Sequence, residues 1–160
     1  MFQMNYSRTQ KGFTLLEILI TLAIVVILSA IIIVPFSNFR ASKLLEVTSN
    51  EVVSLLVQAR ADTISSKNAS QYGVHFEASR VVLFAGDTFV DGNPGNFELS
   101  IDPVLQISNI TLAGSGSDVI FERITGSTAQ PGTVMLGVVA DASQFKIITI
   151  DPAGVAEQVH

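Results

Sequence analysis

A single carboxylate interrupts a long apolar segment near the N-terminus, and this segment restricts the chain more than any other feature. Between Phe13 and Val34 every side chain is apolar or small except those of Thr14, Glu17 and Thr21. At a rise of 1.5 Å per residue, a helix over these residues is about 33 Å long, close to the roughly 30 Å thickness of a hydrocarbon core. A carboxylate there costs on the order of 3 kcal/mol. The sequence therefore predicts a membrane-spanning helix in which Glu17 has a partner or a purpose.

The leader before this segment carries Arg8 and Lys11 and no acidic side chain, which favours a cytoplasmic N-terminus. A secretory signal has a short apolar core that ends in a small-residue cleavage site. Here the small residue, Gly12, comes before the apolar segment, so a cut after it removes only the polar leader. The helix would then stay on the mature protein, with a new ammonium group at Phe13 one helical turn from Glu17.

The run from Gly12 to Glu17, Gly-Phe-Thr-Leu-Leu-Glu, resembles the prepilin-peptidase recognition site of type IV pilins and type II secretion pseudopilins. The resemblance implies that a membrane aspartic peptidase cleaves between Gly12 and Phe13 and N-methylates Phe13. It also implies that Glu17 pairs with the Phe13 amine of an adjacent subunit during fibre assembly. The implied partners are this peptidase and methyltransferase, other pilin or pseudopilin subunits in a homo- or hetero-oligomeric fibre, and an inner-membrane assembly platform. An ordinary single-pass anchor with a chance acidic residue is the alternative.

Composition divides the chain into four predicted segments. These are the leader at residues 1–12, a transmembrane or fibre-core helix at 13–35, an amphipathic helix at 36–67 and a β-rich head at 68–160. Pro35 lacks a backbone donor and crowds the preceding turn, so we expect a kink or a local break near residues 31–35.

The amphipathic segment has an apolar face, because Leu45, Val52, Leu56 and Ala59 recur at helical spacing. We expect this face to lie against a sheet. Alternation and turn residues then predict only strands after residue 68, which makes the chain an α+β protein: a long N-terminal helix packed on an antiparallel sheet, as in pilins. The predicted strands are residues 72–76, 81–84, 97–101, 104–112, 119–124, 133–139, 146–150 and 155–159.

Charge and cysteine content exclude several classes of function. Residues 69–160 carry ten acidic side chains against three basic ones, so the head repels phosphate and does not suit nucleic-acid binding. The chain has no cysteine, which excludes a disulfide and a thiolate metal site.

A second resemblance concerns the later part of the chain, which is similar to minor pseudopilins of the GspH/FimT type. It rests on the end of the helix at residues 58–61, on residues 119–126 and on the closing turn at residues 151–155. Some FimT-like members take part in DNA uptake and carry arginines in the C-terminal tail. Here the tail from Asp151 to His160 contains no Arg or Lys, which argues against DNA binding.

We expect no enzymatic activity and no cofactor. His75 falls on the polar face of a strand beside Glu77, and we interpret it as a solvated surface histidine rather than a general base. No histidine pair or cysteine provides metal ligands. Asp87, Asp91 and Asn93 share what we interpret as a flexible loop, in which a calcium site is the alternative to a plain polar turn.

The expected function is structural. The chain would be a single-pass protein of the inner membrane, with its leader in the cytoplasm and its head outside, and would later form part of a periplasmic or cell-surface fibre. Two alternatives stay open at this point. One is a DNA-uptake minor pilin, and the other is a membrane-anchored adhesin, binding head or enzyme that uses residues 86–96 and 113–118 as contact loops.

Overall fold

The computed structural model describes residues 12–159, and the side chains of residues 30–38 are outside that description. The chain divides into two compact units, the first ending at Asn38 and the second beginning at Phe39. The leader residues Arg8 and Lys11 lie outside the described residues.

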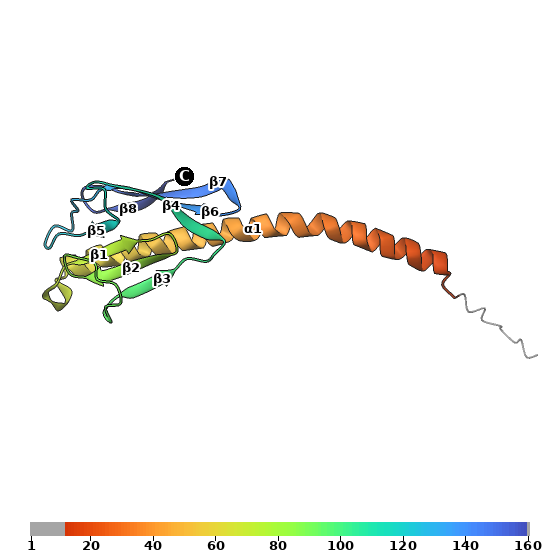
Figure 1. The fold of residues 1–160 in the computed structure, drawn as a ribbon, viewed down its shortest axis with the longest axis horizontal. Helices are drawn as coiled ribbons and strands as arrows, with labels where there is room; N and C mark the ends of the chain where they lie inside the picture. The colour runs from red at the N-terminus through yellow and green to blue at the C-terminus, as the bar shows by residue number, and fades with distance from the viewer. Residues whose placement is uncertain (1–11, 160) are drawn as a thin grey trace, which may run out of the picture. The chain divides into compact units, whose positions relative to one another are not determined.

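Of the first unit, the structure describes the beginning of helix α1 (Leu15–Ile64) and the three residues before it (Figure 1). The Thr14 hydroxyl accepts a hydrogen bond from the Glu17 backbone N–H at 3.2 Å. The Thr14 carbonyl accepts the first helical hydrogen bond, from the Ile18 N–H, also at 3.2 Å. Thr14 is therefore the N-cap of α1, and Glu17 occupies the third helical position, as in a capping box.

Helix α1 is assigned as one helix that continues past Pro35. The side chain of Pro35 is outside the described residues, and the kink predicted there stays a prediction. Across the part of the chain that the structure describes, no helical stretch combines the length and the apolarity needed to cross a membrane. The predicted span at residues 13–35 includes residues 30–35, whose side chains are not described.

In the second unit, α1 buries the predicted face. Leu45, Val52, Leu56 and Ala59 are at most 4% exposed. The pattern did not predict the burial of Ser49, whose hydroxyl donates to the Glu46 carbonyl or to the Gln158 side-chain oxygen, 2.9 Å and 2.6 Å away. A serine can be buried in a helix because its hydroxyl reaches a carbonyl of the preceding turn.

Within residues 12–159, eight strands form two antiparallel four-stranded sheets, which confirms the α+β prediction. The core joins both sheets to the buried face of α1, which runs between them in Figure 1. The first sheet has the order β3-β2-β1-β5 and the second has the order β4-β6-β7-β8. The strands are β1 (Tyr72–Phe76), β2 (Arg80–Ala85), β3 (Phe97–Ser100), β4 (Leu105–Leu112), β5 (Asp118–Ile120), β6 (Gly132–Val138), β7 (Asp141–Ile150) and β8 (Ala156–Val159).

Three boundaries differ from the predicted ones by more than two residues. Helix α1 ends at Ile64, and the short 3-10 helix η1 (Lys67–Ala69) follows it, because Ser66 adopts a left-handed backbone conformation that terminates the helix. Strand β5 ends at Ile120 because the chain then turns, and the Gly126 N–H donates to the Glu122 carbonyl. Strand β7 begins at residue 141, five residues earlier than predicted. The sequence pattern missed its first part because that part carries polar residues and is partly exposed.

The turn between β7 and β8 packs closely against the turn that follows β5. Gly154 has a φ of +77°, and a Cβ placed on it would lie 2.0 Å from the Gly126 carbonyl oxygen. Glycine is required at this position for two reasons, since a side chain would be strained by the backbone and would also collide with a neighbouring main chain.

A second, smaller apolar cluster lies on the other face of the first sheet. Val81 and Leu83 of β2 belong to the main core, while the alternating Val82 and Phe84 are 2% and 1% exposed. Phe89, from the loop between β2 and β3, packs edge-on against Phe84 with ring centroids 5.6 Å apart. The loop at residues 86–96 therefore covers the outer face of this sheet.

Candidate processing and assembly site

The predicted cleavage site lies in exposed backbone before the helix. Gly12 and Phe13 precede α1, and Phe13 is 81% exposed. No atom lies within 4 Å of a Cβ placed on Gly12, apart from its chain neighbours. A bond outside a helix can enter a peptidase without any helical hydrogen bond being broken.

Glu17 is exposed in the first turn of α1. Its backbone N–H is already satisfied by Thr14, while its carboxylate is on the helix surface. An acidic group in the first turn also interacts favourably with the positive end of the helix dipole. Glu17 is thus compatible with the helix start, and its charge faces outward toward whatever surrounds the helix.

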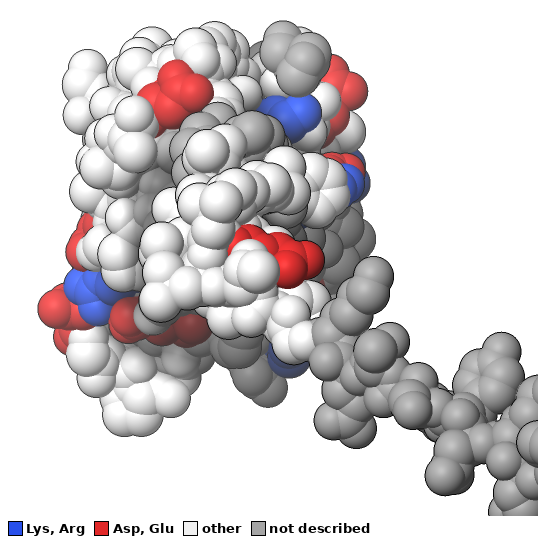
Figure 2. Space-filling view, turned by 90° about the vertical axis from the view of Figure 1, so that its right-hand side faces the viewer, with Lys and Arg blue, Asp and Glu red and all other residues white. Residues whose placement is uncertain are grey.

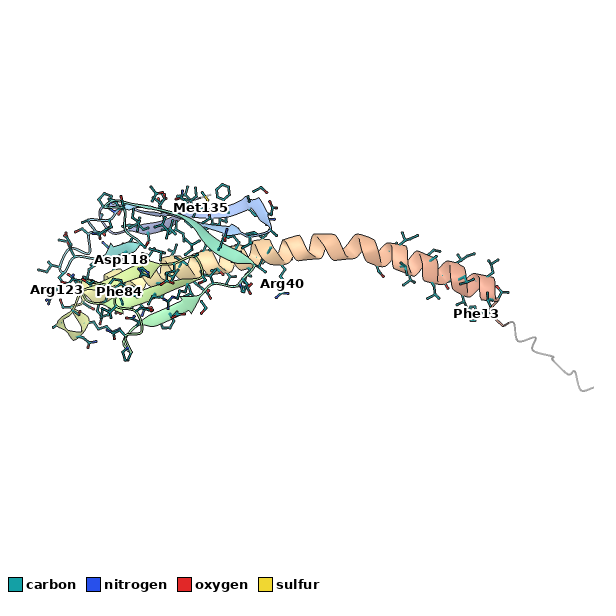
Figure 3. All side chains as sticks on the ribbon, viewed as in Figure 1. Phe13, Arg40, Phe84, Asp118, Arg123 and Met135 are labelled. Carbon is teal, nitrogen blue, oxygen red and sulfur yellow. The ribbon has the colours of Figure 1, made fainter. Side chains whose placement is uncertain are left out.

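The helix surface around Glu17 is apolar on all sides. The large apolar side chains between Leu15 and Leu28 are between 51% and 78% exposed, and side chains extend from both the upper and the lower side of this part of α1 in Figure 3. A helix that is apolar all round is typical of a segment buried in lipid or among other helices. The exposed residues are Leu15, Leu16, Ile18, Leu19, Ile20, Leu22, Ile24, Val25, Val26, Ile27 and Leu28.

The interpretation of His75 as a solvated surface residue is wrong. Its side chain is only 18% exposed, with Nδ1 2.5 Å from Asp118 and Nε2 3.3 Å from Glu77. The imidazole also stacks on Phe89, with ring centroids 3.9 Å apart and an interplanar angle of 6°. Sequence reasoning missed this arrangement because Asp118 becomes a neighbour only through the pairing of β1 with β5.

The loop at residues 86–96, which the sequence suggested to be flexible, is bound to the sheet through hydrogen bonds of its polar side chains. The Asp91 carboxylate accepts hydrogen bonds from Arg80 at 3.1 Å and from the Gly92 N–H at 3.0 Å. The Asn93 side-chain oxygen accepts from the Gly95 N–H at 2.9 Å. Two of the three residues considered for calcium are therefore engaged in an ion pair and a turn. Within residues 12–159, no group of three or more His, Cys, Asp or Glu side chains could hold a metal ion.

Arg80 is the centre of the main ion-pair cluster of the head. Its guanidinium donates to both oxygens of Glu77, at 2.7 and 2.9 Å, and to Asp91 and Glu98, each at 3.1 Å. The hydrogen bonds from Arg80 lower the pKa of Glu77. One basic group is thus surrounded by three acidic groups, and on the face seen in Figure 2 the Lys and Arg residues are isolated from one another rather than joined in a patch.

Comparison with known proteins yields a match to one family model. The prokaryotic N-terminal methylation motif matches residues 7–33, which include Gly12, Phe13 and Glu17. No curated protein and no solved structure matches the chain. The motif implies processing by a prepilin peptidase, a membrane-anchored N-terminus and assembly into pilin-type fibres. The chain therefore carries the predicted prepilin-type N-terminal methylation motif, consistent with a type IV pilin or a pseudopilin.

Proposed function

We propose that this chain is a structural subunit of a type IV pilus or a type II secretion pseudopilus. A prepilin peptidase cleaves it between Gly12 and Phe13 and methylates the Phe13 amine, and an inner-membrane platform then adds it to a helical fibre. The observation that carries this proposal is the start of α1, where an exposed, all-round apolar helix bears one acidic side chain within its methylation motif.

Burial of the apolar helix supports assembly. The side chains of residues 15–28 are covered by lipid before assembly and by neighbouring helices in the fibre. Lipid is as apolar as these side chains, so burial alone does not favour the fibre over the membrane. Close packing of the helices and polar pairing must therefore supply the difference in free energy. The polar pairing comes from Glu17, which is the one charged residue between Phe13 and Val34.

Glu17 sets the axial position of each new subunit. Cleavage after Gly12 creates an ammonium group at Phe13, four residues before Glu17, and the carboxylate neutralises this group in an adjacent copy. Breaking a buried ion pair by removing one partner costs about 3–5 kcal/mol. A subunit added out of register leaves both charges unpaired in an apolar core and is rejected.

The processing step is tested first on the full chain. The protein is expressed with active or inactive prepilin peptidase, and its intact mass and N-terminal sequence are determined. We expect a methylated Phe13 N-terminus only with the active enzyme, and no cleavage in a Gly12→Val variant. Retention of the leader while a control prepilin is processed would show that the chain is a plain membrane anchor.

Assembly is tested separately with engineered cysteines, because the natural chain contains none. Single cysteines are placed along residues 16–28, and sheared fibres are oxidised. Helices packed in a fibre core give disulfide-linked dimers at the positions that face a neighbouring copy. If cross-links fail to form at every position in the fraction that contains processed chain, the fibre-subunit proposal is wrong.

A further inference from the structure

The turn after β5 presents an exposed apolar side chain on a strained backbone. Ile124 is 87% exposed, and its φ is +76°. A β-branched residue with positive φ is a genuine outlier, and such residues persist only where the surrounding structure holds them. Ile124 therefore forms a fixed apolar projection, flanked by the exposed Arg123.

Hydrogen bonds hold this turn in place. The Glu122 N–H donates to the Ser127 carbonyl at 2.8 Å, and the Gly126 N–H donates to the Glu122 carbonyl at 2.9 Å. The Ser127 hydroxyl donates to the Glu122 carboxylate at 2.7 Å. The turn is also tied to α1, since Arg60 donates to the Gly126 carbonyl at 3.1 Å. The projection thus loses little conformational freedom when it binds a partner.

A groove with apolar walls lies elsewhere on the head, between α1 and the edge strand β3. Its volume is about 460 Å³. Its apolar walls include Val47 and Phe97, which are 53% and 57% exposed, and its polar rim includes the exposed Glu51. The lining residues are Val47, Asn50, Glu51, Ser54, Leu55 and Gln58 on α1 and Phe97 and Leu99 on β3.

The projection and the groove lie at different positions along α1, both within the second unit. The turn is bound to Arg60 and lies against Ile64, whereas the groove spans residues 47–58 of α1. At 1.5 Å per residue, the middle of the groove and the middle of the residues that hold the turn are about 15 Å apart along the helix axis. Figure 3 likewise shows Arg123 at the end of the head opposite Arg40.

We propose that Ile124 of one copy docks into the α1–β3 groove of a second copy, with Arg123 of the first copy pairing with Glu51 of the second. This inference rests on the proposed fibre function and names the head surfaces that meet in the fibre. Arg123 beside the projection is opposite in charge to Glu51 at the groove, and both side chains are exposed. The neighbouring Glu122 carboxylate is held by the Ser127 hydroxyl. Because the two surfaces differ and are offset along the axis, the contact is heterologous and repeats into an open filament instead of closing a dimer.

Disulfide trapping between two tagged copies of the full chain tests the contact. One copy carries Ile124→Cys, the other carries Ser54→Cys in the groove, and both are expressed with active peptidase in cells that lack the natural chain. We expect a disulfide between the two tags. A control pair of Val90→Cys and Ser54→Cys, in which the first position is 57% exposed on a different loop, should remain unlinked.

Other outcomes of the same experiment overturn the proposal. A disulfide between two Ile124→Cys copies would indicate a symmetric dimer. Linkage of Ile124→Cys to a different protein would assign the projection to another partner. If cysteines within residues 16–28 link copies but the Ile124–Ser54 pair does not, the fibre proposal stands and this contact is wrong. If neither set links copies, the proposed function itself fails.

Charge reversal tests the polar part of the contact. Arg123→Glu or Glu51→Arg alone should lower the yield of the mixed disulfide about threefold, and the two reversals together should restore it. Glu157→Arg on β8 is the matched control and should leave the yield unchanged. Failure of the double reversal to restore the yield would exclude the pairing.

Replacement of Ile124 by glycine separates docking from folding. Glycine adopts the positive φ without strain, so the thermal unfolding midpoint of Ile124→Gly should not fall. Loss of the apolar side chain should nevertheless lower the amount of chain in sheared fibres about tenfold. Normal incorporation of this variant would contradict the proposal.

Discussion

The imidazole of His75 and the carboxylate of Asp118 face each other across β1 and β5, with Nδ1 2.5 Å from the nearest carboxylate oxygen. The same imidazole stacks on Phe89, so one side chain connects an edge strand, a central strand and the loop that covers the sheet. This arrangement gives His75 a structural role, since a carboxylate lies beside each of its ring nitrogens.

Phe89 should be the main apolar anchor of the loop at residues 86–96. Phe89→Ala removes the contacts with His75 and Phe84, and we expect the unfolding free energy to fall by about 1–2 kcal/mol. Limited proteolysis of the full chain should show faster cleavage within the loop. Phe97→Ala, at a position 57% exposed, is the control and should change stability by less than about 0.5 kcal/mol. Equal cleavage rates in both variants would refute this role.

Gly73 leaves room for the ring of Phe84. A Cβ at position 73 would lie 2.6 Å from the Phe84 Cζ and 2.9 Å from the Val119 carbonyl oxygen. Gly73→Ala should therefore overpack the sheet and lower the unfolding free energy by about 1–3 kcal/mol in chemical denaturation. Gly116→Ala, where the nearest atom would be 3.9 Å away, should be almost neutral. An unchanged denaturation midpoint for Gly73→Ala would contradict the close packing.

The ion pair of Glu77 with Arg80 should make the head less stable in acid. Hydrogen bonds from Arg80 lower the pKa of Glu77 in the folded state below its ordinary value of 4.5. The resulting stabilisation is fully present above pH 4.5 and is lost as the pH falls through the lower, folded-state pKa. Thermal unfolding between pH 2 and pH 6 should show a smaller acid-induced loss for Glu77→Gln than for the natural chain. Parallel curves for the two proteins would exclude this linkage.

Glu17→Gln should leave membrane insertion intact while lowering incorporation into fibres at least about tenfold, because the charge that pairs with the Phe13 amine is lost. Glutamine retains the shape of the side chain and its compatibility with the capping box. The measurement compares the chain in membranes with the chain in sheared fibres by immunoblotting. Thr14→Ser keeps the N-cap and serves as the control. Normal incorporation of Glu17→Gln would show that the pairing idea is wrong.

The sequence by itself determined the features that depend on contiguous residues. The methylation motif occupies one short stretch, and the helix face of Leu45, Val52, Leu56 and Ala59 follows from helical spacing alone. The alternation of apolar residues likewise predicted β1 and most of the other strands, because each strand exposes successive side chains to opposite faces. The kink at Pro35 and the GspH/FimT assignment stay predictions.

Only the tertiary structure decided which distant residues become neighbours. His75 meets Asp118 through strand pairing, Ser49 of α1 meets Gln158 of β8, and Phe89 covers Phe84 through the path of a loop. The positive φ of Ile124 is likewise held by a turn whose anchor is Arg60 on α1. Local patterns record which face of an element is apolar, but they carry no information on register between elements, which is set by the packing of the whole head.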